Sequence, residues 1–170
     1  MDKSGNFYGA TCCDGSAGNG TVFKLTPQGK LTTLYSFNIF ADKVYEPMGS
    51  VVEDASGNLY GVGQGGIYEV LASGGEKVFY LAPKGTNLEP TLTMDSAGNL
   101  YGTSQGGRTN GTGAVYRVSP EGAETDLYSS DGPALNDAVV IDQEGNLFVT
   151  EGRGGANNTG AVIKLIKNAD

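Results

Sequence analysis

Aspartate and asparagine recur at fixed spacing in this chain, in four copies of Asp-x-x-Gly-Asn followed by Leu or Phe and then by Tyr or Phe. Carboxylate and amide oxygens are ligands that Ca²⁺ accepts. Each copy offers a single carboxylate, however, and an aspartate that opens a tight turn accepts a backbone N–H two residues later. We therefore interpret the motif as a structural turn and expect no metal site. Its residues are Asp2, Gly5 and Asn6; Asp54, Gly57 and Asn58; Asp95, Gly98 and Asn99; and Asp142, Gly145 and Asn146.

Three loops rich in Gly and Asn hold the other polar candidates. They cover residues 14–20, 106–112 and 152–159, at equivalent places in their repeats. Binding residues concentrate on loops that a rigid scaffold presents. The candidate ligand-binding residues are Asn19, Arg108, Asn110, Arg153 and Asn157. The expected ligand is a polar polymer such as a carbohydrate, and plain connecting loops are the alternative.

The two cysteines, Cys12 and Cys13, are adjacent in the sequence. Neighbouring cysteines cannot staple distant parts of a fold together. Three interpretations stay open: unpaired loop thiols, a vicinal disulfide in a strained ring, or a reactive or metal-linked site.

Catalysis has little support in these residues. The chain contains no histidine, which is the usual general base and the commonest metal ligand. It also has no Gly-x-Ser-x-Gly elbow and no phosphate-binding loop. We expect no catalytic residue, no cofactor and no metal.

The elements that position these residues are short strands. An apolar run precedes three of the turns, at residues 50–52, 92–94 and 139–141, and a strand-forming Leu-Tyr or Phe-Tyr type pair follows each turn. Two further strand-like runs complete a repeat, for example residues 21–26 and 31–37. No segment has a sustained apolar period of 3.6, so we expect almost no helix.

Four short antiparallel strands in each repeat of about 40 to 50 residues are typical of a β-propeller blade. We expect an all-β fold, a partial β-propeller of about four blades, as a single domain over residues 1–170. The strand before the turn is expected to be innermost. The first blade then lacks its inner strand and the last its outer strand, so we expect a fragment of a longer ring or an arc closed by other copies. A β-sandwich and a β-solenoid are the competing architectures.

Charge and hydropathy limit the classes of partner that we expect for this chain. Lys and Arg number 11 against 19 Asp and Glu, a formal net charge of −8, which disfavours nucleic acid and anionic membranes. No run of 18 apolar residues is present, so we expect no insertion into a membrane. The sequence begins with no basic region followed by an apolar core, so we expect no signal peptide in these residues.

The combined motif resembles the GloVer repeat of bacterial choice-of-anchor tandem-repeat proteins. The residues that carry the resemblance are 95–103, 20–29 and 34–37, and it covers nearly the whole chain. The resemblance implies an extracellular or cell-surface protein with no established reaction. The chain departs from the pattern in having few copies, and from its sequence we expect neither a leader nor a sorting tail.

These observations together favour a non-enzymatic, exported module that acts as a surface scaffold or binding platform. The expected partners are a carbohydrate, a surface protein or further copies of the chain itself. The alternative is a metal-dependent lactonase or lyase of the propeller type, which would need converging carboxylates and a divalent ion.

Overall fold

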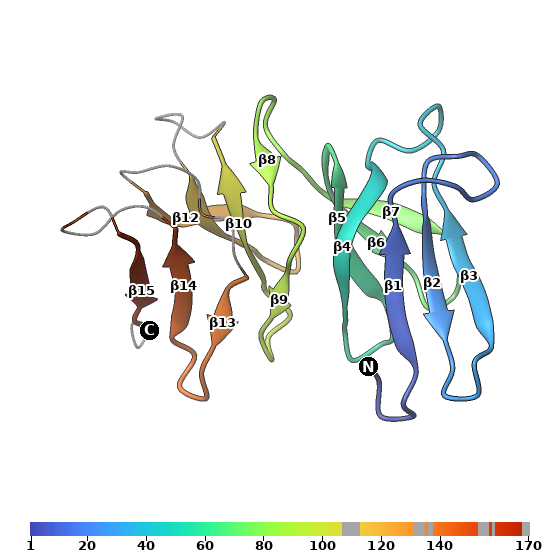
Figure 1. The fold of residues 1–170 in the computed structure, drawn as a ribbon, viewed down its shortest axis with the longest axis horizontal. Helices are drawn as coiled ribbons and strands as arrows, with labels where there is room; N and C mark the ends of the chain where they lie inside the picture. Colours follow the sequence, from blue (N-terminus) through green and yellow to red (C-terminus); the bar gives the residue numbers. More distant parts are fainter. Residues whose placement is uncertain (107–112, 131–134, 136–137, 153–156, 158, 168–170) are drawn as a thin grey trace. The chain divides into compact units, whose positions relative to one another are not determined.

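The computed structural model describes residues 1–106, 113–130, 135, 138–152, 157 and 159–167. The chain divides into two compact units, residues 1–81 and 82–170. Each unit holds two antiparallel β-sheets (Figure 1). Over the described ranges, we find no helix long and apolar enough to cross a membrane. Arg108, Asn110 and Arg153 lie outside the described residues.

In the first unit, two sheets follow the chain strand by strand. One sheet has the order β1-β2-β3 and the other β4-β5-β6-β7. The bounds are β1 (Phe7–Thr11), β2 (Thr21–Leu25), β3 (Leu31–Ser36), β4 (Tyr45–Glu53), β5 (Leu59–Gln64), β6 (Gly66–Val70) and β7 (Glu76–Leu81). Residues 54–58 connect β4 to β5, and β4, the strand before the Asp turn, stands at one edge of its sheet.

The second unit repeats this plan. Its strands are β8 (Asn87–Leu88), β9 (Thr93–Met94), β10 (Leu100–Gln105), β11 (Ala114–Val118), β12 (Glu124–Ser129), β13 (Val140–Ile141), β14 (Leu147–Glu151) and β15 (Ala161–Leu165). The orders are β12-β11-β10-β8, with β9 also paired to β10, and β13-β14-β15. The sheets of the first and last repeats therefore contain three described strands each, and the missing positions are those expected from the sequence.

Proline interrupts the first strand of the two middle repeats. Before Asp95 the sequence predicts one short strand, but β8 and β9 both pair with β10, separated by a segment that contains Pro90. Proline has no N–H to donate to the ladder, and the Glu89 N–H instead donates to the Thr103 carbonyl. In β4 the register shifts between Tyr45 and Met48, across Pro47. The pairing with the next strand is thus discontinuous at the same place in both repeats.

A glycine on the second strand makes room for an aromatic ring on the third. Gly61 is paired with Tyr68 across β5 and β6, and a Cβ at Gly61 would collide with the Tyr68 hydroxyl and ring. Gly102 has the same relation to Tyr116. Tyr68 and Tyr116 are fully buried as a result. In the last repeat the equivalent pair is Val149 and Ile163. There the second strand carries a side chain in place of glycine, and the third strand carries a smaller side chain than tyrosine.

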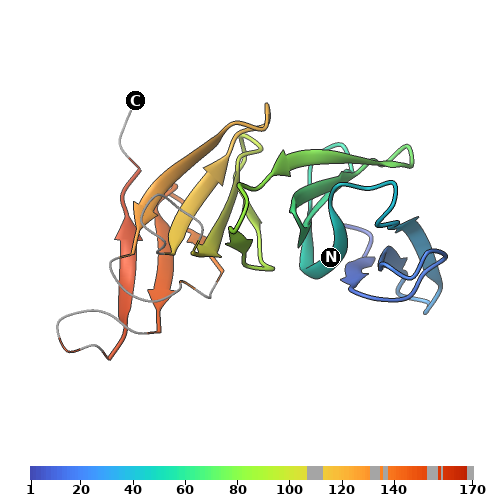
Figure 2. The same cartoon turned by 90° about the horizontal axis from the view of Figure 1, so that it is seen from above.

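Figure 2 shows the sheets from above. The hydrophobic core of each unit is formed by side chains from both of its sheets. In residues 1–81, the buried cluster consists of Val22, Phe37, Val44, Leu59, Tyr68 and Val70. In residues 82–170, it consists of Tyr101, Val115, Leu135, Val139, Leu147 and Val149. Because each cluster draws on both sheets of its unit, packing between neighbouring sheets holds each unit together.

Candidate functional site

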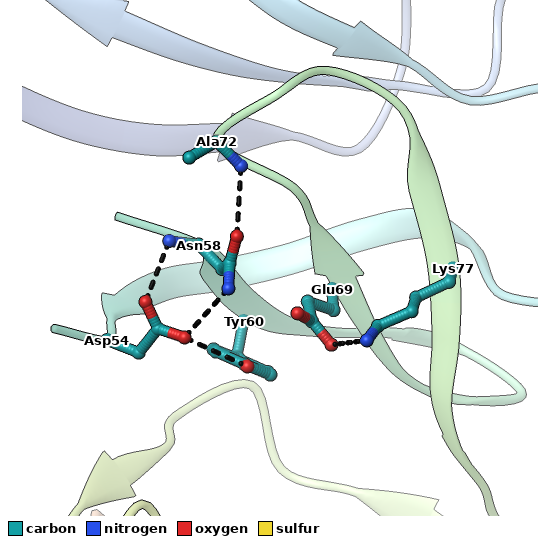
Figure 3. A network of polar contacts seen from close by, with 6 residues as sticks. All are labelled: Asp54, Asn58, Tyr60, Glu69, Ala72 and Lys77. Atoms are coloured by element: carbon teal, nitrogen blue, oxygen red, sulfur yellow. Dashed lines mark hydrogen bonds and ion pairs between the residues drawn. The ribbon is translucent and has the colours of Figure 1, made fainter. Parts of the chain in front are cut away.

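Each Asp turn is closed by hydrogen bonds to its own aspartate, as Figure 3 shows for the second repeat. Asp54 Oδ1 accepts the N–H groups of Ser56 (2.8 Å) and Asn58 (2.9 Å). Asp54 Oδ2 accepts the Asn58 side-chain amide (2.9 Å) and the Tyr60 hydroxyl (3.2 Å). A carboxylate has about four acceptor sites, so the turn itself uses all of those of Asp54.

The same bonds occur around the other three aspartates, apart from the tyrosine bond in the last repeat, where Phe148 takes the place of tyrosine. The glycines of the four turns have φ between 80° and 84°, a region that L side chains resist. The asparagine also reaches the next turn of its sheet, because Asn58 Oδ1 accepts the Ala72 N–H at 3.0 Å. The motif thus stabilises the turn by hydrogen bonds and links it to the next turn of the sheet.

Hydrogen bonding lowers the pKa of all four turn aspartates. At Asp2 the Asn6 side chain has the largest effect and the pKa falls to about 2. At Asp142 the Asn146 side chain has the same role. At Asp54 burial alone would raise the pKa, but the bonds from Asn58, Ser56 and Tyr60 outweigh it. The aspartates are therefore ionised at neutral pH, with their charge satisfied inside the turn.

A groove of about 950 Å³ opens beside two of these turns, wholly within residues 82–170. Its walls come from both sheets of that unit. The apolar lining includes Met94, Leu127, Ile141, Leu147, Leu165 and Ile166, and the charged lining comprises Asp95, Arg117, Asp142, Glu144, Lys164 and Lys167. Grooves that combine apolar walls with a few polar groups are typical of ligand sites.

Cations supply the uncommitted polar groups of this groove. Asp95 and Asp142 are engaged by their own turns. Arg117 Nε, by contrast, is buried and has no hydrogen-bond partner among the described residues. Lys164 Nζ lies 5.2 Å from the centroid of the Phe148 ring. The groove thus holds three cations, Arg117, Lys164 and Lys167, beside the three carboxylates, in a chain whose net charge is −8.

Tyr101 lies between the groove and its turn. Its hydroxyl donates to Asp95 Oδ2 at 3.0 Å, and its ring lines the groove. Burial, the Asp95 hydrogen bond and the Asp95 charge raise the Tyr101 pKa to about 12, while Arg117 acts in the opposite direction. The hydroxyl therefore stays protonated at neutral pH, and Tyr101 is a hydrogen-bond donor with an aromatic face.

The described loop residues named from the sequence lie elsewhere. Asn19 Oδ1 accepts the Ile39 N–H at 3.1 Å, and the Asn19 carbonyl accepts the Glu46 N–H at 3.0 Å. Asn19 therefore ties its loop to the segment before β4. Asn157 is exposed in a turn. Neither residue lines the groove. Three residues that do line it were predicted from the sequence as parts of structural turns and not as ligand contacts, namely Asp95, Asp142 and Gly145.

The groove could have been anticipated in part from one repeated position. The residue opposite the aromatic of the second strand is Lys24, Glu69, Arg117 and Lys164 in the four repeats. Three of the four are basic, a pattern visible in the sequence once the strand register is known. The register comes only from the structure.

The structure brings together no group of three or more His, Cys, Asp or Glu side chains able to hold a metal ion within the ranges that it describes. Cys12 and Cys13 are both free and exposed, with their Sγ atoms 2.6 Å apart.

Comparison with known proteins shows the fold. No protein-family model matches the sequence, and no curated protein matches it. A solved streptogramin B lyase is similar to the chain with a TM-score of 0.62 and 15% identity, over 98% of this chain and 56% of that one. Selenomethionine-substituted virginiamycin B lyase from Staphylococcus aureus is similar with a TM-score of 0.61 and 14% identity, over 98% of this chain and 57% of that one.

A third similar structure is virginiamycin B lyase from Staphylococcus aureus with quinupristin, a catalytically inactive variant in which alanine replaces a histidine. Its TM-score is 0.61 at 13% identity, over 98% of this chain and 58% of that one. The chain thus spans a little over half the length of these proteins. At such identities the likeness shows the fold alone: the chain is an all-β protein with the β-propeller fold, and its four sheets are blades.

Proposed function

We propose that the chain is a non-enzymatic, exported β-propeller module of a surface protein, and that it binds an acidic polysaccharide in the groove of residues 82–170. The GloVer-like repeats support the surface location, as an inference from resemblance. The observation that carries the binding proposal is the set of three cations, Arg117, Lys164 and Lys167, that line a 950 Å³ groove.

The chemistry of the groove favours a sugar acid. Arg117 lines the groove, and a ligand carboxylate would bind its guanidinium through charge-assisted hydrogen bonds. The Tyr101 ring and the apolar walls suit the carbon-rich face of a sugar ring. Lys164 and Lys167 add positive charge along the same groove, so a polymer with repeated carboxylates meets several cations.

The test compares polymers that differ in charge alone. Isothermal titration with a polyuronate and with a neutral polymer of the same linkage should show binding of the polyuronate only. Arg117→Met should weaken that binding at least about tenfold, the cost of one charge-assisted hydrogen bond. Lys84→Met, which removes an exposed cation that does not line the groove, should leave it unchanged.

Two results would contradict the binding proposal. Equal affinity for the neutral polymer would remove the role of charge, and unchanged affinity of Arg117→Met would place the site elsewhere. If neither polymer binds, the scaffold role alone remains. We also propose that the chain associates with further copies of itself, which sedimentation velocity on the free protein measures.

The second candidate function is a lyase of the propeller type, favoured by the names of the similar structures. Against it, the 170 residues contain no histidine, the side chain whose loss inactivates the variant described above. Incubation with quinupristin and a divalent metal ion, followed by mass spectrometry, tests this function. Conversion of quinupristin would establish the lyase and overturn the non-enzymatic proposal.

A further inference from the structure

Cys12 and Cys13 follow directly on β1 and point two sulfur atoms toward each other in solvent. Both side chains are exposed, and the Sγ atoms lie 2.6 Å apart. The turn networks, the two hydrophobic cores and the groove involve neither residue. The pair therefore needs an explanation of its own.

The backbone on both sides of the pair is fixed to the sheet. The Thr11 hydroxyl donates to the Cys13 carbonyl at 3.1 Å, and the Thr21 N–H donates to Thr11 Oγ1 at 3.1 Å. On the other side, the Gly20 N–H donates to the Asp14 carbonyl at 2.9 Å. An anchored segment keeps the two sulfur atoms together, so that the reaction of one thiol places its product beside the other.

We propose that Cys12 and Cys13 form a reversible thiol–disulfide site, which closes an eight-membered ring disulfide by exchange with a small cationic or neutral disulfide. This proposal is independent of the proposed polysaccharide binding.

The exchange has two balanced steps. One cysteine thiolate attacks a sulfur of the small disulfide, forming a mixed disulfide and releasing one small thiol. The second cysteine thiolate then attacks the protein sulfur of that mixed disulfide and releases the second small thiol. The two protein thiols lose two protons and two electrons, and the small disulfide is reduced to two thiols.

The charges around the pair select the partner. Asp14 and Glu46 both act on Cys13 electrostatically, after the stronger effects of the Cys12 hydrogen bond and of burial, and the pKa of the Cys13 thiol is raised. Negative charge nearby repels an anionic disulfide and attracts a cationic one. We therefore expect cystamine to react faster than oxidised glutathione, and both reactions to accelerate as the pH rises and thiolate forms.

The experiment follows intact mass. Reduced protein is treated with cystamine, quenched in acid and then alkylated with N-ethylmaleimide. The wild type should lose two hydrogens and take up neither cystamine nor maleimide. Cys12→Ser and Cys13→Ser should each stop at a mixed disulfide that carries half a cystamine. Wild-type protein that keeps cystamine adducts, or that forms disulfide-linked dimers, would overturn the ring.

Two further measurements separate geometry from redox chemistry. Phenylarsine oxide condenses with two converging thiols and releases water, so it should bridge the reduced wild type and neither serine variant. Bridging without ring closure in cystamine would show converging sulfurs and refute the proposal. The rate advantage of cystamine over oxidised glutathione should be several-fold at low salt and shrink at high salt; equal rates at low salt would refute the charge selection.

Discussion

Glu69 lies opposite Tyr60 across β5 and β6 and is almost fully buried. In the other repeats this position carries a basic residue, for example Lys24 at 5.5 Å from the centroid of the Tyr8 ring. Here the cation comes from the next strand, because Lys77 Nζ lies 2.9 Å from Glu69 Oε2 (Figure 3). The second repeat thus has an acid opposite its tyrosine and supplies the balancing cation one strand farther along the sheet.

Removal of Lys77 should therefore destabilise the first unit. Lys77→Thr leaves the buried Glu69 carboxylate without its ion pair, and we expect a loss of about 1–3 kcal/mol in the free energy of unfolding, since Lys77 itself is half exposed. Urea denaturation at pH 7 measures this loss.

A double variant provides the matched control. Glu69→Lys combined with Lys77→Thr copies the first repeat, where Lys24 is paired with Thr32. It should regain most of the stability lost by Lys77→Thr. If the double variant is as unstable as Lys77→Thr alone, a lysine at position 69 cannot replace the ion pair as Lys24 does in the first repeat.

The glycine beside each buried tyrosine should not tolerate a side chain. Gly102→Val places atoms where the Tyr116 ring lies, so we expect a loss of about 1–3 kcal/mol from overpacking. Adding Tyr116→Ile reproduces the Val149 and Ile163 pair of the last repeat and should restore part of the stability. Thermal melts of Gly102→Val and of the double variant measure the difference. Equal melting temperatures would contradict the idea that a smaller residue at position 116 makes room for the valine.

The four turn aspartates should make the protein sensitive to acid. Their pKa values are lowered in the folded state, to about 2 at Asp2 from an ordinary 3.8. The unfolded chain therefore takes up protons first as the pH falls, so this stabilisation is complete above pH 3.8 and is lost on the way down to about 2.

Asp54→Asn isolates one turn. The variant replaces an acceptor by a donor next to the Asn58 amide, so it should be about 1–3 kcal/mol less stable at neutral pH. Its stability should also fall less steeply than that of the wild type in acid. The control Glu53→Gln, at an exposed carboxylate one residue away, should retain the wild-type slope in melts across this pH range.

Glu76 should act in a separate and higher pH range. Burial first, and the charge of Asp42 second, raise the Glu76 pKa from 4.5 to about 7. The folded state holds this proton longer than the unfolded one, so stability is greatest below pH 4.5 and declines as the pH rises through about 7. Glu76→Gln should remove this decline and add about 1–2 kcal/mol at pH 8, after allowance for solvent screening. Urea midpoints at pH 5 and pH 8 test it; a variant with an unchanged decline would assign the effect to another group.

The spacing of the Asp turns predicted much of the strand order, because a hairpin turn of fixed chemistry leaves the flanking strands little choice of partner. The split of the strand before Asp95 was missed, although Pro90 carried the signal. Glu69 was missed because the sequence shows no strand register, and register decides which side chains stand opposite each other. The groove was missed for a related reason: its residues come from seven strands, two turns and the segment after β15, and periodicity within a single strand does not report such convergence.

The ion pair of Glu69 and Lys77 has a consequence for engineering. Both residues belong to one repeat, so that repeat carries its own compensating charge and can be transplanted whole into an array of similar units. A junction placed between β6 and β7 would separate the two residues and leave the buried Glu69 carboxylate without its cation. Boundaries between β3 and β4 and between β7 and β8 keep acid and base together, which makes those connections the suitable junctions for recombining whole blades.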